Sequence, residues 1–253
     1  MNLETILYEK SDAVATIKLN RPHVLNAASR KLWLDFRRAL REAAKDTEVK
    51  AIIITGEGRA FSAGADLKES QSRTLDEYRD YLVEGQEISR ELYRMEKPTI
   101  AAVNGYALGS GCEIAVCCDI RIAAESAKFG FPEARVASGV GSGVLQLLPL
   151  LLGMGKAKEL IFTAEYIDGD EAARIGLVNM VVPDDQLMHK AQEIAAKMAA
   201  NSALSISLMK AILNRAHEAS MEAIMDWEVE MMMSAIQTQE RVKALEDFTA
   251  RKR

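Results

Sequence analysis

Two acidic residues stand out as candidates for chemistry. Glu113 lies in ALGSGCEIAVCCDI (residues 107–120), between small residues and an apolar run typical of a buried helix. Glutamate is seldom fully buried without a partner, because removing its charge from water is costly. Glu133 follows in KFGFPEARV, placed by a proline after an apolar strand. Both side chains therefore need a functional or a structural explanation.

Two turns of small residues accompany these acids. FSAGAD (residues 61–66) leads to a helix start near Asp66, and LGSG (residues 108–111) opens the helix that carries Glu113. Small residues let a ligand approach the backbone closely. The first N–H groups of a helix have no internal partner and carry the positive end of its dipole. Two such groups directed at one point would stabilise negative charge on a carbonyl oxygen.

This combination suggests proton transfer beside a polarised carbonyl group. One carboxylate could deprotonate a water molecule while the other donates a proton to the neighbouring carbon. Burial would raise the carboxyl pKa values toward neutrality and make proton exchange easier. A structural interpretation stays open for these residues: Glu113 as a buried acid satisfied by the helix N-terminus, and Glu133 as a surface acid after a turn.

Other catalytic motifs are missing from the sequence. There is no G-x-S-x-G serine and no G-x-x-x-x-G-K-[ST] phosphate loop. The run GVGSGV (residues 139–144) lacks the third glycine of a dinucleotide fingerprint. The three histidines, His23, His189 and His217, are isolated. We therefore expect no metal site and no metal or redox cofactor.

Composition limits the class of protein and its partners. The 253 residues are 49% hydrophobic and 27% charged, with a net charge of −5, which indicates a globular protein and argues against nucleic acid as a partner. The start of the chain does not have the pattern of a signal peptide, and the most apolar segment is too short for a membrane span. The cysteines, Cys112, Cys117 and Cys118, are expected to be reduced thiols on a buried helix, so we expect a cytoplasmic location.

Hydrophobic periodicity predicts an α/β core with a mainly parallel sheet. The expected strands and helices alternate until about residue 143, after which the pattern is mainly helical with one short strand, LVNMVV (residues 177–182). The Met-rich stretch from Met221 to Met233 indicates a packing surface that meets another subunit in part. The predicted strands are residues 14–20, 51–56, 99–105 and 120–124, and the predicted helices are residues 29–46, behind a Ser cap, and about 75–95.

Five segments together resemble the crotonase, or enoyl-CoA hydratase/isomerase, superfamily. They are NRPHVLNA, AIIITGEGRAFSAGADLKE, KPTIAAVNGYALGSGCEIAVCCDIRIA, AKFGFPEARV and GDEAARIGLVNMVVP. The resemblance implies a spiral of β-β-α repeats (residues 1–195) followed by a C-terminal helical oligomerisation region (residues 196–253). It also implies homo-trimers or hexamers that bind acyl-CoA thioesters.

The resemblance also assigns roles to individual residues. Ala65 and Ser110 match the two backbone donors of the family's oxyanion hole, and Glu113 and Glu133 match the two catalytic glutamates of its hydratases. The residues matching the CoA path are Ala63, Gly64, Ala65, Asp66, Leu67, Lys68, Gly109 and Ser110, with Val24 and Leu25 along the nucleotide part.

The sequence departs from the family pattern after Glu133. Val140 stands where hydratases have a proline, and Leu147 where they have an arginine. These two positions border the acyl pocket in the family. The change predicts a more apolar wall and a preference for a bulkier acyl group than crotonyl.

The sequence-based hypothesis is therefore an enoyl-CoA hydratase that adds water to a 2-enoyl-CoA, giving a 3-hydroxyacyl-CoA. Glu113 would activate the water and Glu133 would protonate the α-carbon. The alternatives are a double-bond isomerase, a hydratase of cyclic or aryl enoyl-CoA, and a non-catalytic subunit that binds acyl-CoA.

Overall fold

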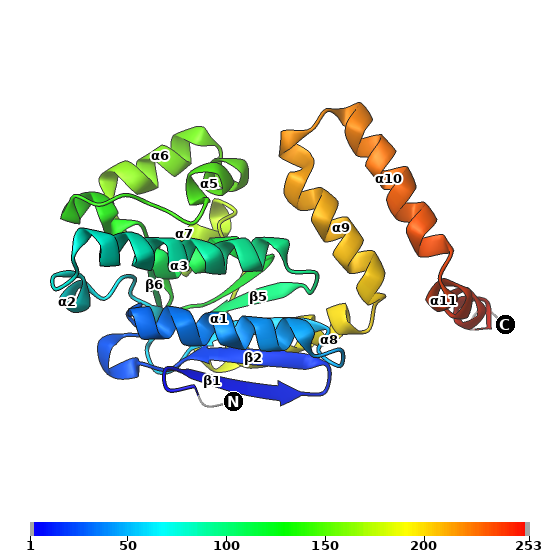
Figure 1. Cartoon of the computed structure of the whole chain (residues 1–253), viewed down its shortest axis with the longest axis horizontal. Helices are drawn as coiled ribbons and strands as arrows, with labels where there is room; N and C mark the ends of the chain where they lie inside the picture. The colour runs from blue at the N-terminus through cyan, green and yellow to red at the C-terminus, as the bar shows by residue number, and fades with distance from the viewer. Residues whose placement is uncertain (1–2, 251–253) are drawn as a thin grey trace.

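Two β-sheets form the framework of the chain, which the computed structural model describes from residue 3 to residue 250 (Figure 1). Apart from β1, which is antiparallel to β2, neighbouring strands of the large sheet are parallel. The order of this sheet is β1 (Ile6–Ser11), β2 (Val14–Leu19), β3 (Ala51–Gly56), β5 (Thr99–Val103), β7 (Ile120–Ala124) and β10 (Met180–Val182). The small sheet has the order β4 (Ala60–Ser62), β6 (Tyr106–Leu108), β8 (Lys128–Gly130) and β9 (Ile167–Asp168).

The chain winds through both sheets in turn. The consecutive pairs β3–β4, β5–β6 and β7–β8 each place one strand in the large sheet and the next in the small sheet. Strands β3, β5 and β7 are parallel neighbours in the large sheet, and β4, β6 and β8 are parallel neighbours in the small sheet. This arrangement confirms the predicted α/β spiral of β-β-α repeats with a C-terminal helical region.

The large sheet is buried on both faces, as the apolar run of β3 predicts. Ile52 and Ile54 face the main core, whereas Ala51 and Ile53 face the opposite side. Helix α8 (Leu187–Ala199) covers that opposite side with Leu187 and other buried residues. Helices α1 (Arg30–Lys45) and α3 (Leu75–Arg94) cover the main-core side and run across the front of the sheet in Figure 1.

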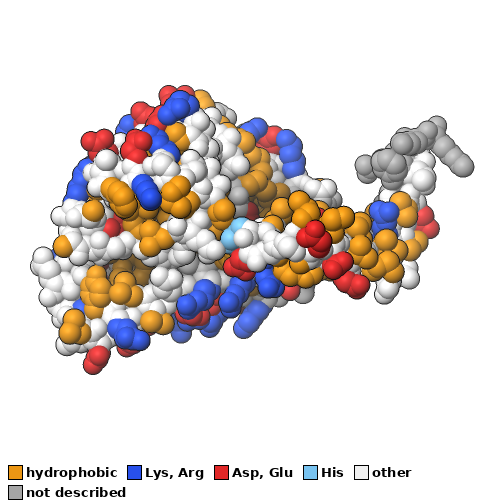
Figure 2. Space-filling model, turned by 90° about the horizontal axis from the view of Figure 1, so that it is seen from above, with side chains coloured by type: hydrophobic (Ala, Val, Ile, Leu, Met, Phe, Trp, Pro, Cys, Tyr) orange, Lys and Arg blue, Asp and Glu red, His pale blue; other side chains and the backbone are white. Residues whose placement is uncertain are grey.

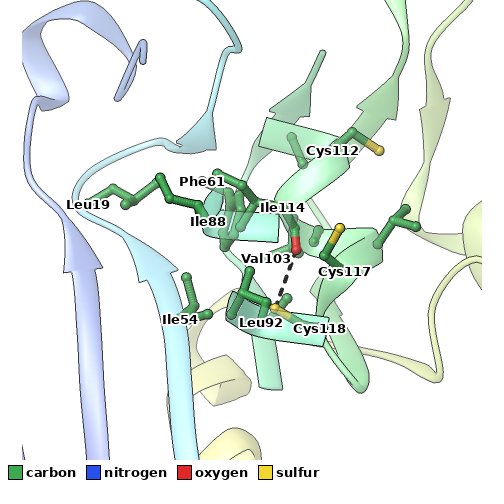
Figure 3. Packing of buried hydrophobic residues seen from close by; sticks show 14 of the residues in the cluster. Leu19, Ile54, Phe61, Ile88, Leu92, Val103, Cys112, Ile114, Cys117 and Cys118 are labelled. Carbon is green, nitrogen blue, oxygen red and sulfur yellow. Dashed lines mark hydrogen bonds between the residues drawn. The ribbon is translucent and has the colours of Figure 1, made fainter. Parts of the chain in front are cut away.

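Helix α4 (Ser110–Cys117) lies inside the main core (Figure 3). Its cysteines are buried free thiols, which confirms the expectation for Cys112 and Cys117; Cys118 caps the helix end and its Sγ lies 3.4 Å from the Ile114 carbonyl oxygen. The buried Arg121 donates to the carbonyl oxygen of Cys118 at 2.7 Å and to that of Leu177 at 2.6 Å. These hydrogen bonds from Arg121, a residue of β7, therefore hold the carboxyl end of α4 in place.

Short helices connect these layers. The α-helices are α2 (Leu67–Ser70), α5 (Val144–Leu152), α6 (Met154–Thr163) and α7 (Gly169–Arg174). The 3₁₀ helices are η1 (Pro22–Val24), η2 (Pro132–Val136), η3 (Asp184–Gln186) and η4 (Ala216–Glu218).

The C-terminal arm consists of α9 (Ala203–Arg215), α10 (Met221–Ile236) and α11 (Gln239–Ala250). It projects from the body in Figure 1, and Figure 2 shows apolar side chains gathered along it. One ion pair attaches α9 to the body: Lys210 Nζ donates to Asp119 Oδ2 at 2.7 Å and to the Lys97 carbonyl oxygen at 3.1 Å. The division at residues 195 and 196 stays a prediction, and it would fall inside α8.

The helices and all but one of the strands predicted from periodicity agree with the structure to within two residues at each end. The strand predicted at residues 177–182 begins three residues later, at Met180. The sequence did not predict β1, the two-residue β9 or the pairing of short strands into a second sheet. Three-residue strands are too short to carry a readable alternation. Among residues 3–250, no helix combines the length and apolar character needed to cross a bilayer.

Candidate active site

A cavity of about 440 Å³ lies between α3, the N-terminus of α4 and η2. Its floor is built from the two turns of small residues and the two acids, and an aromatic wall faces them from α1 and α3. The floor comprises Ala63, Gly64, Ala65, Gly109, Ser110, Glu113 and Glu133; the wall includes Trp33, Tyr78 and Tyr81.

The two turns of small residues lie against each other at Gly64 and Gly109. A Cβ added to Gly64 would come 2.7 Å from the Leu108 carbonyl oxygen and 3.5 Å from the Gly109 Cα atom. Both glycines also have positive φ, +92° and +53°. Side chains at these positions would clash or strain the backbone, so the close approach of the turns requires glycine.

The N–H groups of Ala65 and Ser110 are free donors in these turns that belong to residues lining the cavity. The neighbours of Ala65 are paired: Ala63 N–H donates to the Leu25 carbonyl oxygen and Asp66 N–H to that of Ala28, at 2.9 and 3.1 Å. Ser110 is the first residue of α4, where an N–H has no intrahelical acceptor. Neither N–H donates to an acceptor in the part of the chain that the structure describes, and both residues line the cavity.

Glu113 is 6% exposed, and its two carboxylate oxygens have one donor each. Gly141 N–H donates to Oε1 at 2.6 Å, and the Ser142 hydroxyl donates to Oε2 at 2.7 Å. Burial raises the pKa of Glu113, and the two hydrogen bonds oppose that rise. These partners explain how the helix holds an acid in its core: the donors come from a loop rather than from the helix N-terminus.

Glu133 has a different environment on η2. Its Oε2 is buried and has no hydrogen-bond partner among the described residues. Burial raises the pKa of Glu133 to about 7; its own backbone N–H opposes this effect, and the charge of Glu113 adds to it. The two carboxyl groups therefore differ in their surroundings: Glu113 has two donors from a loop, whereas Glu133 Oε2 has none among the described residues.

Not every residue expected along the CoA path lines the cavity. Leu67 does so, whereas Asp66 caps α2 and accepts a hydrogen bond from Arg21 at 2.9 Å. Lys68 is exposed at the surface. Val24 and Leu25 are also outside the cavity wall, although the Leu25 carbonyl oxygen is bonded to Ala63 at its edge.

The two residues expected to form the acyl pocket do not line this cavity either. Val140 packs against the main core, and its neighbours Gly139 and Gly141 line the cavity instead. Leu147 faces separate hollows beside α3 and α9. Their influence on the acyl group stays a prediction, without the direct contact on which it was based.

Sequence reasoning missed the residues that bind Glu113. Gly141 and Ser142 lie in GVGSGV, a run that lacks the dinucleotide fingerprint. The glycine N–H groups and the serine hydroxyl of this run could have been proposed as the donors, because a buried carboxylate requires donors from elsewhere in the chain. The aromatic wall and Gln86 of α3 were also missed. Among the residues whose side chains are described (3–246, 249 and 250), no three His, Cys, Asp or Glu side chains are grouped to hold a metal ion.

Known proteins resemble this chain along nearly its whole length. The family model "Enoyl-CoA hydratase/isomerase" matches residues 9–253. The short-chain-enoyl-CoA hydratase of Clostridium acetobutylicum is 41% identical over 254 residues, covering 100% of this chain and 97% of that protein. The crotonyl-CoA hydratase of Syntrophomonas wolfei is 39% identical, with 100% and 98% covered.

Solved structures give the same result for the fold. The enoyl-CoA hydratase of Bacillus anthracis superposes with a TM-score of 0.95 at 35% identity, covering 98% of this chain and 97% of that chain. With the family model matching nearly the whole sequence, this chain belongs to the enoyl-CoA hydratase/isomerase family.

Proposed function

We propose that the protein is an enoyl-CoA hydratase, a hydro-lyase that reversibly adds water to a 2-enoyl-CoA with syn geometry. The main observation is the pair of unlike carboxyl groups in one cavity: Glu113 with two donors, and Glu133 with a buried oxygen that lacks a partner. A base and an acid are the two groups that hydration needs. The relatives named as hydratases support the same reaction.

In this proposal, the thioester oxygen accepts hydrogen bonds from the N–H groups of Ala65 and Ser110. Glu113 takes a proton from the water molecule while the water oxygen bonds to C3 of the acyl group. Glu133 gives its proton to C2 of the acyl group. One molecule of water is added overall, and proton exchange from Glu113 to Glu133 restores the starting state. The two N–H groups stabilise the enolate-like charge that develops on the thioester oxygen, and no metal or redox cofactor takes part.

The remaining CoA contacts are proposals that follow from position. Ala63, Gly64 and Leu67 line the cavity and would border the pantetheine arm. Asp66, Lys68, Val24 and Leu25 lie just outside and would meet the rest of CoA.

We propose a short-chain acyl group for the substrate. The relatives are named for short-chain and crotonyl substrates. The expected preference for a bulkier acyl group relied on Val140 and Leu147, which do not line the cavity. Comparing kcat/KM for crotonyl-, octenoyl-, cinnamoyl- and cyclohexenecarbonyl-CoA distinguishes the short-chain hypothesis from the bulkier-substrate hypothesis. A preference for any of the last three thioesters would restore the bulkier-substrate hypothesis.

The test of function is hydration of crotonyl-CoA, followed by loss of the absorbance of the conjugated thioester. Glu113→Gln and Glu133→Gln should each lower kcat by about 10²-fold or more, the scale of general acid–base catalysis, with little change in thioester binding. Binding without turnover by the unmodified protein would indicate a scaffold subunit. A shifted double bond without added water would indicate an isomerase, and near-normal hydration by either variant would remove that residue from the mechanism.

We also propose that the protein is a cytoplasmic homo-trimer or a hexamer formed from two trimers, with neither nucleic acid nor membrane as a partner. The exposed apolar residues of the C-terminal arm support self-association, because a surface stripe of this kind is typical of an interface. The stripe on α10 comprises Met221, Met225, Val229, Met232, Met233 and Ile236.

A further inference from the structure

Ser142 lies next to Gly141 in the loop before α5, and the reaction described above does not use it. Its hydroxyl donates to Glu113 Oε2 at 2.7 Å, and its carbonyl oxygen accepts from the Cys117 thiol at 3.4 Å. Ser142 is thus attached to α4 at two points. It also lines the cavity, on the same side as Glu113.

The backbone of Ser142 is in an unfavourable conformation for a residue with a side chain. Its φ is +59°, in the left-handed region that favours glycine. The next residue, Gly143, has a φ of +75°. A serine held in such a conformation suggests that the hydroxyl compensates for the strain through a contact of its own.

We propose that Ser142 is a positioning residue that fixes the Glu113 carboxylate and keeps it in the form able to accept a proton from water. The inference rests on the proposed hydratase function. Gly141 N–H already holds Oε1, so the Ser142 hydroxyl fixes the second oxygen and with it the rotation of the carboxylate plane. Two donors thus define the orientation of a carboxylate that lines the cavity, and each oxygen keeps a lone pair that can accept a proton.

Few other titratable groups face Glu113. Among the elements packed against α4, β4, β5 and α5 have no titratable side chain, β6 has only the exposed Tyr106, and α3 contributes Tyr78 and Tyr81 to the cavity wall. The Tyr81 pKa is raised by burial, so this phenol stays neutral. The remaining groups are Glu133 on η2, Arg135 at the cavity wall, Arg121 at the far end of α4, and the neutral thiols Cys112 and Cys117.

The sign of the effect follows from the hydrogen bond. A donor to the carboxylate stabilises its ionised form, so removing the Ser142 hydroxyl raises the pKa of Glu113. The acidic limb of the profile of kcat/KM against pH reports the base in the free enzyme. Ser142→Ala should therefore move that limb to higher pH by about one unit, the scale of one hydrogen bond to a charged group.

Three further variants separate the hydroxyl from the backbone. Ser142→Gly removes the hydroxyl and relieves the positive φ, so it should match Ser142→Ala. Ser142→Thr keeps a hydroxyl, so its limb should stay at the wild-type pH even if less protein folds. Ser89→Ala is the matched control: Ser89 is a buried serine on α3 whose hydroxyl bonds to the Gly85 carbonyl oxygen, and its limb should not move.

The experiment measures the pH profile of all five proteins with crotonyl-CoA, together with an infrared titration of the carboxyl band that Glu113→Gln removes. An unmoved limb and band in Ser142→Ala and Ser142→Gly would overturn the positioning role. If the unmodified protein fails to hydrate enoyl-CoA, the proposed function fails, and the infrared titration still decides the role of Ser142.

Discussion

Glu113 and Glu133 illustrate how two residues of the same type can be prepared for opposite roles. The difference comes from donors rather than from depth: Glu113 is the more buried, yet it has two hydrogen bonds and Glu133 Oε2 has none. Desolvation raises both carboxyl pKa values, and the two donors from the loop oppose that rise in Glu113. The assignment of base and acid therefore follows from the loop that contains Gly141 and Ser142.

The raised pKa of Glu133 has a consequence for folding stability. With a pKa of about 7 in the folded state and 4.5 as the ordinary value, the folded protein binds this proton more tightly than the unfolded chain. Its contribution to stability is therefore complete below the ordinary value and is lost as the pH rises through about 7. Glu133→Gln should reduce the fall in unfolding free energy between about pH 5 and about pH 8, measured by denaturant titration. An equal fall in unfolding free energy in both proteins would contradict the raised pKa of Glu133 in the folded state.

Ser110 separates side chain from backbone in the same site. Ser110→Ala keeps the N–H and should leave kcat within a few-fold, whereas Ser110→Pro removes a donor and should cost about 10²–10³ in rate. Proline is tolerated in the first turn of a helix, so circular dichroism should show an intact fold. Loss of activity in a folded Ser110→Ala protein would instead assign the chemistry to the hydroxyl.

At the scale of elements, the ion pair between Lys210 and Asp119 fixes α9. The Lys210 side chain is 8% exposed, and removing it would leave Asp119 without its cation and two carbonyl oxygens without a donor. Lys210→Met should destabilise the docking of α9 by less than about 3 kcal/mol, the lower end of the scale for breaking a fully buried pair, because the Asp119 side chain is 24% exposed. Hydrogen exchange of the α9 amides should rise more than exchange in β3.

Lys197→Met is the matched control for that prediction, because Lys197 pairs with Glu193 at the surface and its side chain is 71% exposed. Exposed pairs contribute little, so exchange in α9 should not change. Equal effects in the two variants would show that the buried pair has no special role in docking the helix.

The elements also show what the sequence could predict. The apolar run of β3 and the periodicity of α1 depend on residues close in the chain, and both elements end where expected. The contact of Gly141 and Ser142 with Glu113 joins residues 28 and 29 positions apart, through a loop with no regular pattern. Candidate acids could thus be predicted from local sequence, whereas their partners and the true cavity wall could not.

At the scale of the whole molecule, the apolar stripe of α10 predicts self-association. Met225→Glu together with Val229→Glu places charge in the stripe and should shift the mass measured by analytical ultracentrifugation toward the monomer. Ser234→Glu adds a charge on the other side of the same helix and serves as the control. An unchanged mass in the double variant would remove α10 from the interface.

The buried cysteines can report two different opening events of the folded protein, because they lie beneath different parts of the structure. Cys112 is 0% exposed in the main core, while Cys117 and Cys118 both border the hollow formed with Met209 and Lys210 of α9. A thiol reagent can modify each sulfur only when its cover opens. Detachment of the arm should let Cys117 and Cys118 react first, and Cys112 should react only when the core unfolds. The two labelling rates would therefore measure arm release and global unfolding separately, in the unmodified chain.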